Sequence, residues 1–153
     1  MMREIWRGAL AGAAGTAALN ATTYLDMTLR GRPASGTPEK SVERLSETTG
    51  VPVPGDEQAH ANRLSGLGAL SGIATGVTVG AAYGLLRSVG VRLPVWAGAL
   101  VAGGGAMLAA NAPMAAAGVS HPSEWSGTDW LADAVPHAAY GAVTAATFAA
   151  TDR

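Results

Sequence analysis

The chain of 153 residues has a formal net charge of -1 and contains no cysteine. These values exclude a disulfide framework, a cysteine-based zinc or iron–sulfur site and a strongly basic nucleic-acid-binding surface. Alanine and glycine, with 33 and 21 residues, make up about a third of the chain, and only 14% of residues are charged, against ~25% in average soluble domains.

Segments without charged residues divide the chain. They are residues 8–25, 64–86, 93–119 and, with a neutral His137, 134–151. A helix rises 1.5 Å per residue, so ~20 residues cross the ~30 Å hydrocarbon core of a bilayer. We therefore predict an all-α integral membrane four-helix bundle, a single domain over residues 1–153, in the inner or plasma membrane. The predicted spans are residues 8–29, 64–87, 94–118 and 131–151.

A soluble protein built from Ala/Gly-rich buried helices is the alternative to this interpretation. Four helices without a polar stripe would all need cover, and little chain would remain to provide it. A secretory signal peptide is an alternative for the first segment alone, because basic residues precede its apolar stretch.

Polar residues occupy the connection between the first two spans, residues 30–63. Within it, Pro38 in a first-turn position and Gly50 as a stop signal predict a short surface helix over residues 38–49. The following connections are shorter. A basic loop runs from Arg87 to Arg92, and the last connection holds two interfacial tryptophans.

The basic residues leave the membrane orientation undecided, because five of them lie on each side of the bilayer in this topology. The short basic loop after Arg87 favours both termini on the inside.

The second predicted span has glycine at every fourth position, which makes four consecutive GxxxG units. These glycines are Gly68, Gly72, Gly76, Gly80 and Gly84. In lipid, small residues at this spacing let helix backbones approach closely and drive their association. Similar series occur in the other spans: Gly8, Gly12 and Thr16; Gly98, Ala102, Ala106 and Ala110; and Ala134, Ala138, Ala142, Ala146 and Ala150. We expect Gly/Ala-zipper packing, either within the bundle or between copies in a homo-oligomer.

Ionisable residues inside a predicted span are candidates for function because their burial in lipid is costly. Asp133, His137 and Tyr140 are spaced by four and three residues, so they share one face of the fourth span. Histidine titrates near neutral pH, and such a group would relay a proton or bind a ligand. The alternative is an interfacial cluster that only anchors the start of the helix.

Three further polar residues lie at membrane depth. Asn20 is expected to hydrogen-bond to another helix, and Asp26 is expected to pair with Arg30 four residues later. Asn111 lies just before Pro113, so it would satisfy or exploit a carbonyl that the proline frees.

Known catalytic and cofactor-binding patterns are absent from the sequence. The three histidines show no metal-ligand spacing, and no nucleophile elbow, phosphate-binding loop or dinucleotide fingerprint is present. We therefore expect no metal, no cofactor and no enzymatic activity.

Residues 7–20, RGALAGAAGTAALN, and residues 133–141, DAVPHAAYG, resemble a group of small actinobacterial multi-pass membrane proteins. More remotely, the chain is similar to the YagU-type bacterial inner-membrane proteins, a family associated with acid tolerance. The resemblance implies an inner-membrane location and draws attention to His137.

Two functional hypotheses follow. The first is a non-enzymatic accessory or assembly subunit, whose partners are the lipid bilayer and either another membrane protein or a second copy of the chain. The second is a small proton-linked transporter or channel that uses the aspartate, histidine and tyrosine of the fourth span.

Overall fold

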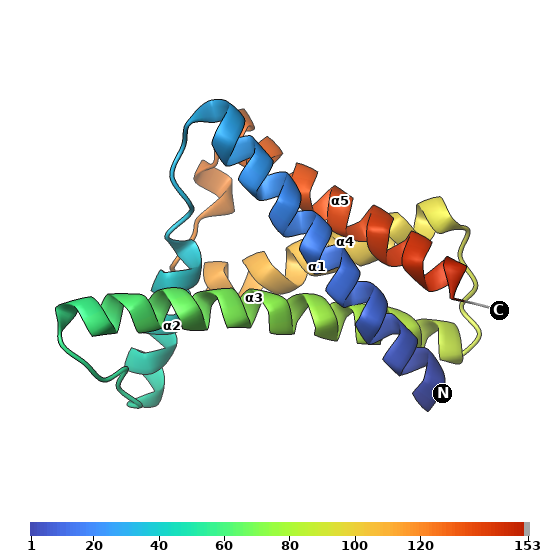
Figure 1. Ribbon diagram of the computed structural model, residues 1–153, viewed down its shortest axis with the longest axis horizontal. Coiled ribbons are helices and arrows are strands. Elements are labelled where there is room, and N and C mark those ends of the chain that lie inside the picture. The colour runs from blue at the N-terminus through green and yellow to red at the C-terminus, as the bar shows by residue number, and fades with distance from the viewer. Residues whose placement is uncertain (152–153) are drawn as a thin grey trace.

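Helices account for all the regular structure of residues 1–151, the part of the chain that the computed structural model describes. These residues form five α-helices and one short 3₁₀ turn, without a strand among them, and Figure 1 shows how the helices are arranged. The prediction of an all-helical protein is therefore confirmed. The elements are α1 (Met2–Arg30), α2 (Thr37–Thr49), α3 (Glu57–Ser88), α4 (Val95–Ala116), η1 (Pro122–Glu124) and α5 (Gly127–Ala150).

Three of the helices extend beyond the predicted spans, and a side-chain cap marks the earlier start in two of them. The Asp56 side chain accepts a hydrogen bond from the Ala59 N–H at 2.9 Å, so α3 begins at Glu57 within the expected polar loop. Ser126 caps α5 in the same way, and this helix begins at Gly127 rather than at residue 131. The first helix already begins at Met2 and ends where Gly31 adopts a left-handed conformation with φ 61°.

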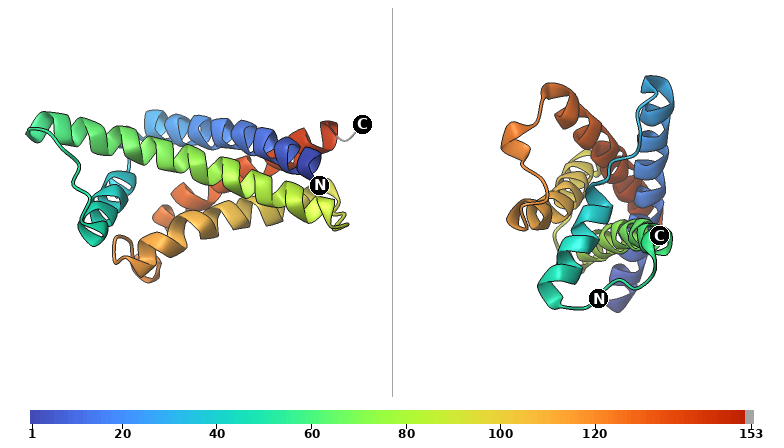
Figure 2. Two further views of the ribbon diagram at one scale, coloured as in Figure 1. Left: turned by 90° about the horizontal axis from the view of Figure 1, so that it is seen from below. Right: turned by 90° about the vertical axis from the view of Figure 1, so that its left-hand side faces the viewer.

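The long helices contact one another in the spatial order α3, α1, α5, α4. Helix α1 runs antiparallel to both α3 and α5, and α5 runs antiparallel to α4 (Figure 1). Helices α3 and α4 meet near the loop that joins them, where a Cβ at Gly98 would contact the Tyr83 ring, and they diverge from there (Figure 2). The amphipathic α2 lies across the first half of α3, with Pro38 against Gly68.

This arrangement gives the molecule two ends. We call the end with the start of α1, the α3–α4 loop and the end of α5 the terminus side, because the first and the last of the helices begin and end there, respectively (Figure 1). We call the opposite end, with α2 and the η1 connection, the α2 side. Segments free of charged residues lie between them.

Helices α1 and α3 touch backbone to backbone. Gly8 and Gly12 of α1 lie against Gly80 and Gly84 of α3, and a Cβ at Gly80 would lie 2.5 Å from the Cα of Gly12. Any side chain at these positions would push the helices apart, so glycine is required for this approach.

The five-glycine series is divided between different neighbours. Gly76, Gly80 and Gly84 face α1, and Gly68 meets Pro38 of α2, whereas nothing lies within 4 Å of a Cβ built on Gly72. The close contacts of this series are therefore made within the chain.

The alanine series of α5 does not form a packing face within the chain. Ala138, Ala142 and Ala146 are exposed, and the buried side of the helix instead carries larger residues together with Gly141. Gly141 lies against Gly103 of α4, so a single glycine pair brings α4 and α5 together. The physical reason is that the bulky buried side chains decide which face of α5 turns inward.

Three aromatic rings lie in the core where α1, α3 and α5 meet. Tyr140 and Phe148 of α5 are fully buried, and Tyr83 of α3 packs edge-to-face on Phe148 with ring centroids 5.3 Å apart. The Tyr140 hydroxyl donates a hydrogen bond of 2.6 Å to the carbonyl of Gly76. This bond joins α5 to α3 although α1 lies between them in the order of contacts.

Large apolar side chains cover the outside of the long helices. Leu10, Leu70, Leu100 and Leu108 are each at least 61% exposed. Helices α3 and α4 are long and apolar enough to cross a membrane; the other helices do not reach the same hydropathy. By length and hydropathy, two helices therefore qualify as possible membrane spans, whereas the charge-free segments predict four.

The contact between α1 and α3 is tested by placing leucine at Gly80. We expect Gly80→Leu to destabilise the protein by about 1–3 kcal/mol or more, because the new side chain meets the α1 backbone. Thermal unfolding in mild detergent measures the effect. Gly66→Leu, on the same helix, is the matched control, since the same change there enters open space. Equal loss of stability in both variants would contradict the observed helix pairing.

Candidate functional site

A polar contact links α4 and α5 within their otherwise apolar surfaces. The Asn111 side-chain N–H of α4 donates a hydrogen bond of 2.7 Å to the carboxylate of Asp133 on α5. Both residues are half-buried. The bond crosses from one helix to the other, so the amide of Asn111 is used for helix association and not, as expected, for the carbonyl freed by Pro113.

His137 joins this contact from the next turn of α5. Its Nδ1 lies 2.7 Å from the main-chain carbonyl oxygen of Asp133 and 3.5 Å from the Asp133 carboxylate. In the neutral ring, the N–H at Nδ1 donates to that carbonyl, and Nε2 keeps its lone pair. The His137 side chain is only 11% exposed. The group of Asn111, Asp133 and His137 is called the polar cluster below.

Tyr140 does not belong to the polar cluster, although it shares a face of α5 with Asp133 and His137. Its hydroxyl bonds to Gly76 of α3 instead. Residues 133 and 140 are separated by seven positions, which is about 10 Å along a helix, so they meet different neighbours. The predicted group of aspartate, histidine and tyrosine is therefore not formed. Tyr140 contacts α3, and Asn111 is the third member of the cluster with Asp133 and His137.

The two polar residues of α1 have different surroundings. Asp26 pairs with Arg30 at 2.8 Å, as expected, and also with Arg32 at 2.5 Å. Asn20 is half-buried, but among residues 1–151 its side chain makes no hydrogen bond, so the expected bond to another helix is not formed. Neither residue forms part of the polar cluster.

The start of α5 is held by a reciprocal cap. Ser126 accepts a hydrogen bond from the Asp129 N–H, and the Asp129 carboxylate accepts bonds from the Ser126 hydroxyl and N–H. The hydroxyl first, then the N–H and, more weakly, the charge of Arg30 lower the pKa of Asp129 below its usual 3.8. This cap sets the beginning of the helix that carries Asp133 and His137.

A second contact, which the sequence analysis did not predict, joins α1 to α5 at the terminus side. Arg7 of α1 donates a hydrogen bond of 3.0 Å to the Phe148 carbonyl near the end of α5, and its guanidinium lies 4.5 Å from the centre of the Phe148 ring. Arg87 of α3 approaches the same ring at 5.7 Å. The positive charges suit the negative end of the α5 dipole. Spacing along the chain contains no signal for contacts between residues so far apart.

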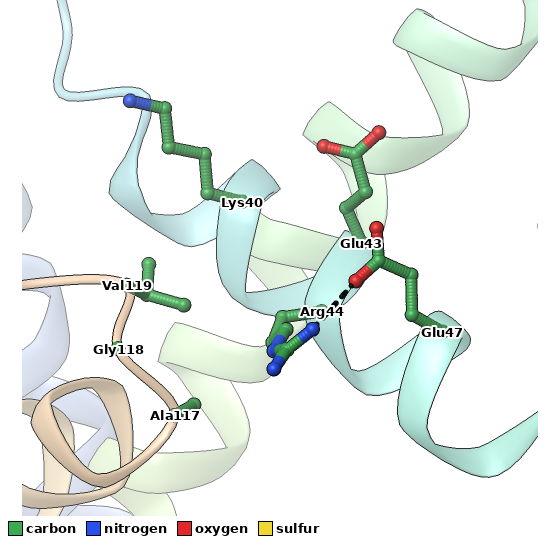
Figure 3. Close-up of a pocket in the computed structure, with 7 residues that line it drawn as sticks. All are labelled: Lys40, Glu43, Arg44, Glu47, Ala117, Gly118 and Val119. Carbon is green, nitrogen blue, oxygen red and sulfur yellow. Dashed lines mark hydrogen bonds and ion pairs between the residues drawn. The ribbon is translucent and has the colours of Figure 1, made fainter.

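An open depression lies on the α2 side, between α2 and the turn after α4 (Figure 3). Its wall is formed by Lys40, Glu43, Arg44, Glu47, Ala117, Gly118 and Val119. Arg44 extends between the helix and the turn and pairs with Glu47 at 2.9 Å. All four charged side chains are exposed, so the depression lacks the buried polar groups of an enclosed binding site.

Comparisons with protein-family models, with curated proteins and with solved structures found no match for this chain. The resemblance to YagU-type inner-membrane proteins therefore stays a prediction. Within residues 1–151, no group of three or more His, Asp or Glu side chains is arranged to hold a metal ion.

The cap of α5 makes a pH-dependent contribution to stability. Because the pKa of Asp129 is lowered in the fold, its stabilisation is complete above about pH 3.8 and is lost as the pH falls through the lowered pKa. We expect Asp129→Ala to lower the Tm at neutral pH, and the difference from the wild type to vanish in strong acid. Thermal unfolding across this pH range measures it. Glu124→Ala removes an exposed carboxylate outside the cap, and an equal effect in that control would contradict the assignment.

Proposed function

We propose that this chain is a multi-pass membrane protein of the inner or plasma membrane, in which α1, α3, α4 and α5 cross the bilayer as a four-helix bundle. The observation that carries the proposal is the separation of polar and apolar surface along the molecule. Charged residues gather at the terminus side and the α2 side, and exposed leucines cover the helices between them. Water would make such an apolar belt unfavourable, whereas lipid solvates it.

The tryptophans support the same placement. Trp6 and Trp96 lie at the terminus side, and Trp125 and Trp130 stack edge-to-face at the α2 side with ring centroids 5.0 Å apart. Tryptophan is enriched at both membrane–water interfaces. Two pairs at opposite ends of the helices therefore fit the two headgroup regions of a bilayer.

The accessible surface also favours a chain that is not surrounded by water. It measures 9017 Å². A water-soluble monomer of 15.2 kDa is expected to expose about 7,100 Å². The excess comes from long helices that lie in a splayed arrangement and leave their outer faces uncovered.

Helix position explains why α1 and α5 are less apolar than the other two proposed spans. Each of them contacts a long helix on two sides, whereas α3 and α4 flank the bundle and share a limited contact with one another. The flanking helices present more surface to lipid and need higher hydropathy. The inner pair makes its close contacts with the flanking helices through glycines on both partners, α1 against α3 and α5 against α4.

Within the membrane, we assign the chain the role of a non-enzymatic accessory or assembly subunit. Its close helix contacts are made by glycine, and one glycine of the α3 series, Gly72, lies on an open face with exposed Ala69 one turn before it. An exposed face of this kind allows another transmembrane helix to approach closely. The partner is another membrane protein or a second copy of the chain.

Membrane fractionation and affinity purification test this proposal together. We expect the chain to stay in the membrane after washing with alkaline carbonate and to purify in mild detergent with a partner at a stoichiometric amount. Gly72→Leu is expected to remove the partner while leaving the Tm unchanged. The matched control is Leu25→Ala, a change on the exposed face of α1. Release by carbonate would contradict membrane insertion, and a monomer without companion would contradict the assembly role.

A proton-linked transporter or channel is the second candidate, and the polar cluster favours it. Asp133 and His137 place an acid and a titratable ring beside one another in α5, with Asn111 on the facing helix. In lipid, such groups mark proton and ion pathways.

Proton flux into proteoliposomes tests the second candidate. His137→Ala should abolish flux that the wild-type protein supports, because the neutral ring at this position is the group that accepts a proton. His121→Ala, at an exposed position outside the helices, serves as the control and should conduct like the wild type. Wild-type vesicles that behave like empty vesicles would exclude this function.

A further inference from the structure

The two ends of the molecule carry charges of opposite sign. Among the described residues, the terminus side has four arginines, Arg3, Arg7, Arg87 and Arg92, against one carboxylate, Glu4. The α2 side has five basic residues against nine acidic ones. The acidic residues of the α2 side are Asp26, Glu39, Glu43, Glu47, Asp56, Glu57, Glu124, Asp129 and Asp133.

Ion pairs leave this difference in net charge unchanged, because each pair joins charges of opposite sign. Arg30 and Arg32 both pair with Asp26, and Arg44 pairs with Glu47. On the terminus side, Glu4 is the single described carboxylate, and it pairs with Arg7. The field at the terminus side is therefore positive, and the field at the α2 side is negative.

The arginines of the terminus side lie at the depth of lipid headgroups if the bundle spans a bilayer. Arg3 and Arg92 are exposed, and exposed Trp6 and Trp96 mark the interface beside them, at 66% and 70% exposure. A guanidinium has planar donors that match two oxygens of a phosphate, so it binds a phosphodiester better than an ammonium does. The chemistry of this surface therefore fits anionic phospholipid.

We propose that the terminus side binds anionic phospholipid headgroups through Arg3 and Arg92. This inference depends on the proposed membrane function. The α2 side, with its excess of carboxylates, is repelled by the same headgroups, so the protein has a preferred orientation. The start of α1 and the end of α5 face the anionic, cytoplasmic leaflet surface, and α2 lies on the opposite side of the membrane.

Lipid retention tests the headgroup contact. The full chain is reconstituted into vesicles of equal parts phosphatidylcholine and phosphatidylglycerol, extracted in mild detergent, and its bound lipid is counted by native mass spectrometry. We expect enrichment of phosphatidylglycerol, and a loss of about fivefold in that enrichment for each of the changes Arg3→Gln and Arg92→Gln. The control for the double variant Arg3→Gln with Arg92→Gln is the double variant Lys40→Gln with Arg44→Gln, which removes equal charge from the α2 side and should retain the wild-type ratio.

Two results would overturn the inference. One is an absence of phosphatidylglycerol enrichment in the wild type, and the other is an equal loss of enrichment in both double variants. Either result leaves the membrane proposal intact as long as the chain resists the carbonate wash, so failure of the headgroup contact is distinguishable from failure of membrane insertion.

Orientation is tested separately, because the natural chain has no cysteine to interfere with labelling. Ala34→Cys reports the α2 side and Val89→Cys reports the terminus side, and both positions are exposed. With a membrane-impermeant maleimide on spheroplasts, we expect labelling of the first variant, and of the second only after permeabilisation. The reverse pattern, or equal labelling of both, would overturn the orientation.

Discussion

The contact of α1 with α3 at glycine is the constraint on which the rest of the arrangement depends. Gly12 and Gly80 bring the two backbones together, and this approach is closer than any Cβ allows. In lipid, apolar side chains gain little from leaving the solvent, so helices associate through dispersion contacts and hydrogen bonds. Close backbone approach maximises those contacts. Once α1 is fixed on α3, its other face offers Gly15 to Tyr140 and Thr144 of α5, and the third helix follows.

The same principle recurs between α4 and α5 at Gly103 and Gly141, with a different consequence. Because the backbones are close there, Asn111 reaches the carboxylate of Asp133 across the interface toward the α2 side. A carboxylate in or near lipid is costly unless it accepts hydrogen bonds. The amide of Asn111 reduces that cost and at the same time holds the two helices in register. The polar cluster thus has a structural role and also contains Asp133 and His137, the two groups that the proposed proton transport would use.

The distribution of charge varies along the helices, and hydropathy varies from one helix to the next across the bundle. Along the helices, charged residues and tryptophans lie at the two ends, and the middle is apolar. Across them, the most apolar helices, α3 and α4, flank the bundle, while α1 and α5 lie inside. Both divisions follow from contact with lipid in the proposed setting. The sign of charge then distinguishes the two ends, because carboxylates concentrate on the α2 side.

Much of the helical layout was readable in the sequence, because charge-free segments and capping residues are local features. The surface helix ending at Gly50 and the four-residue glycine spacing depend only on the chain itself. Which helix faces which glycine was decided by the tertiary structure. Alanine and glycine occur on every side of α5, so its inward face was set by Tyr140 and Phe148; the sequence pattern placed Tyr140 in a polar group and gave Phe148 no role. The separation of Tyr140 from Asp133, and the bond from Asn111, likewise arise from neighbours distant in the sequence, since a helical repeat defines a face but not the partner that covers it.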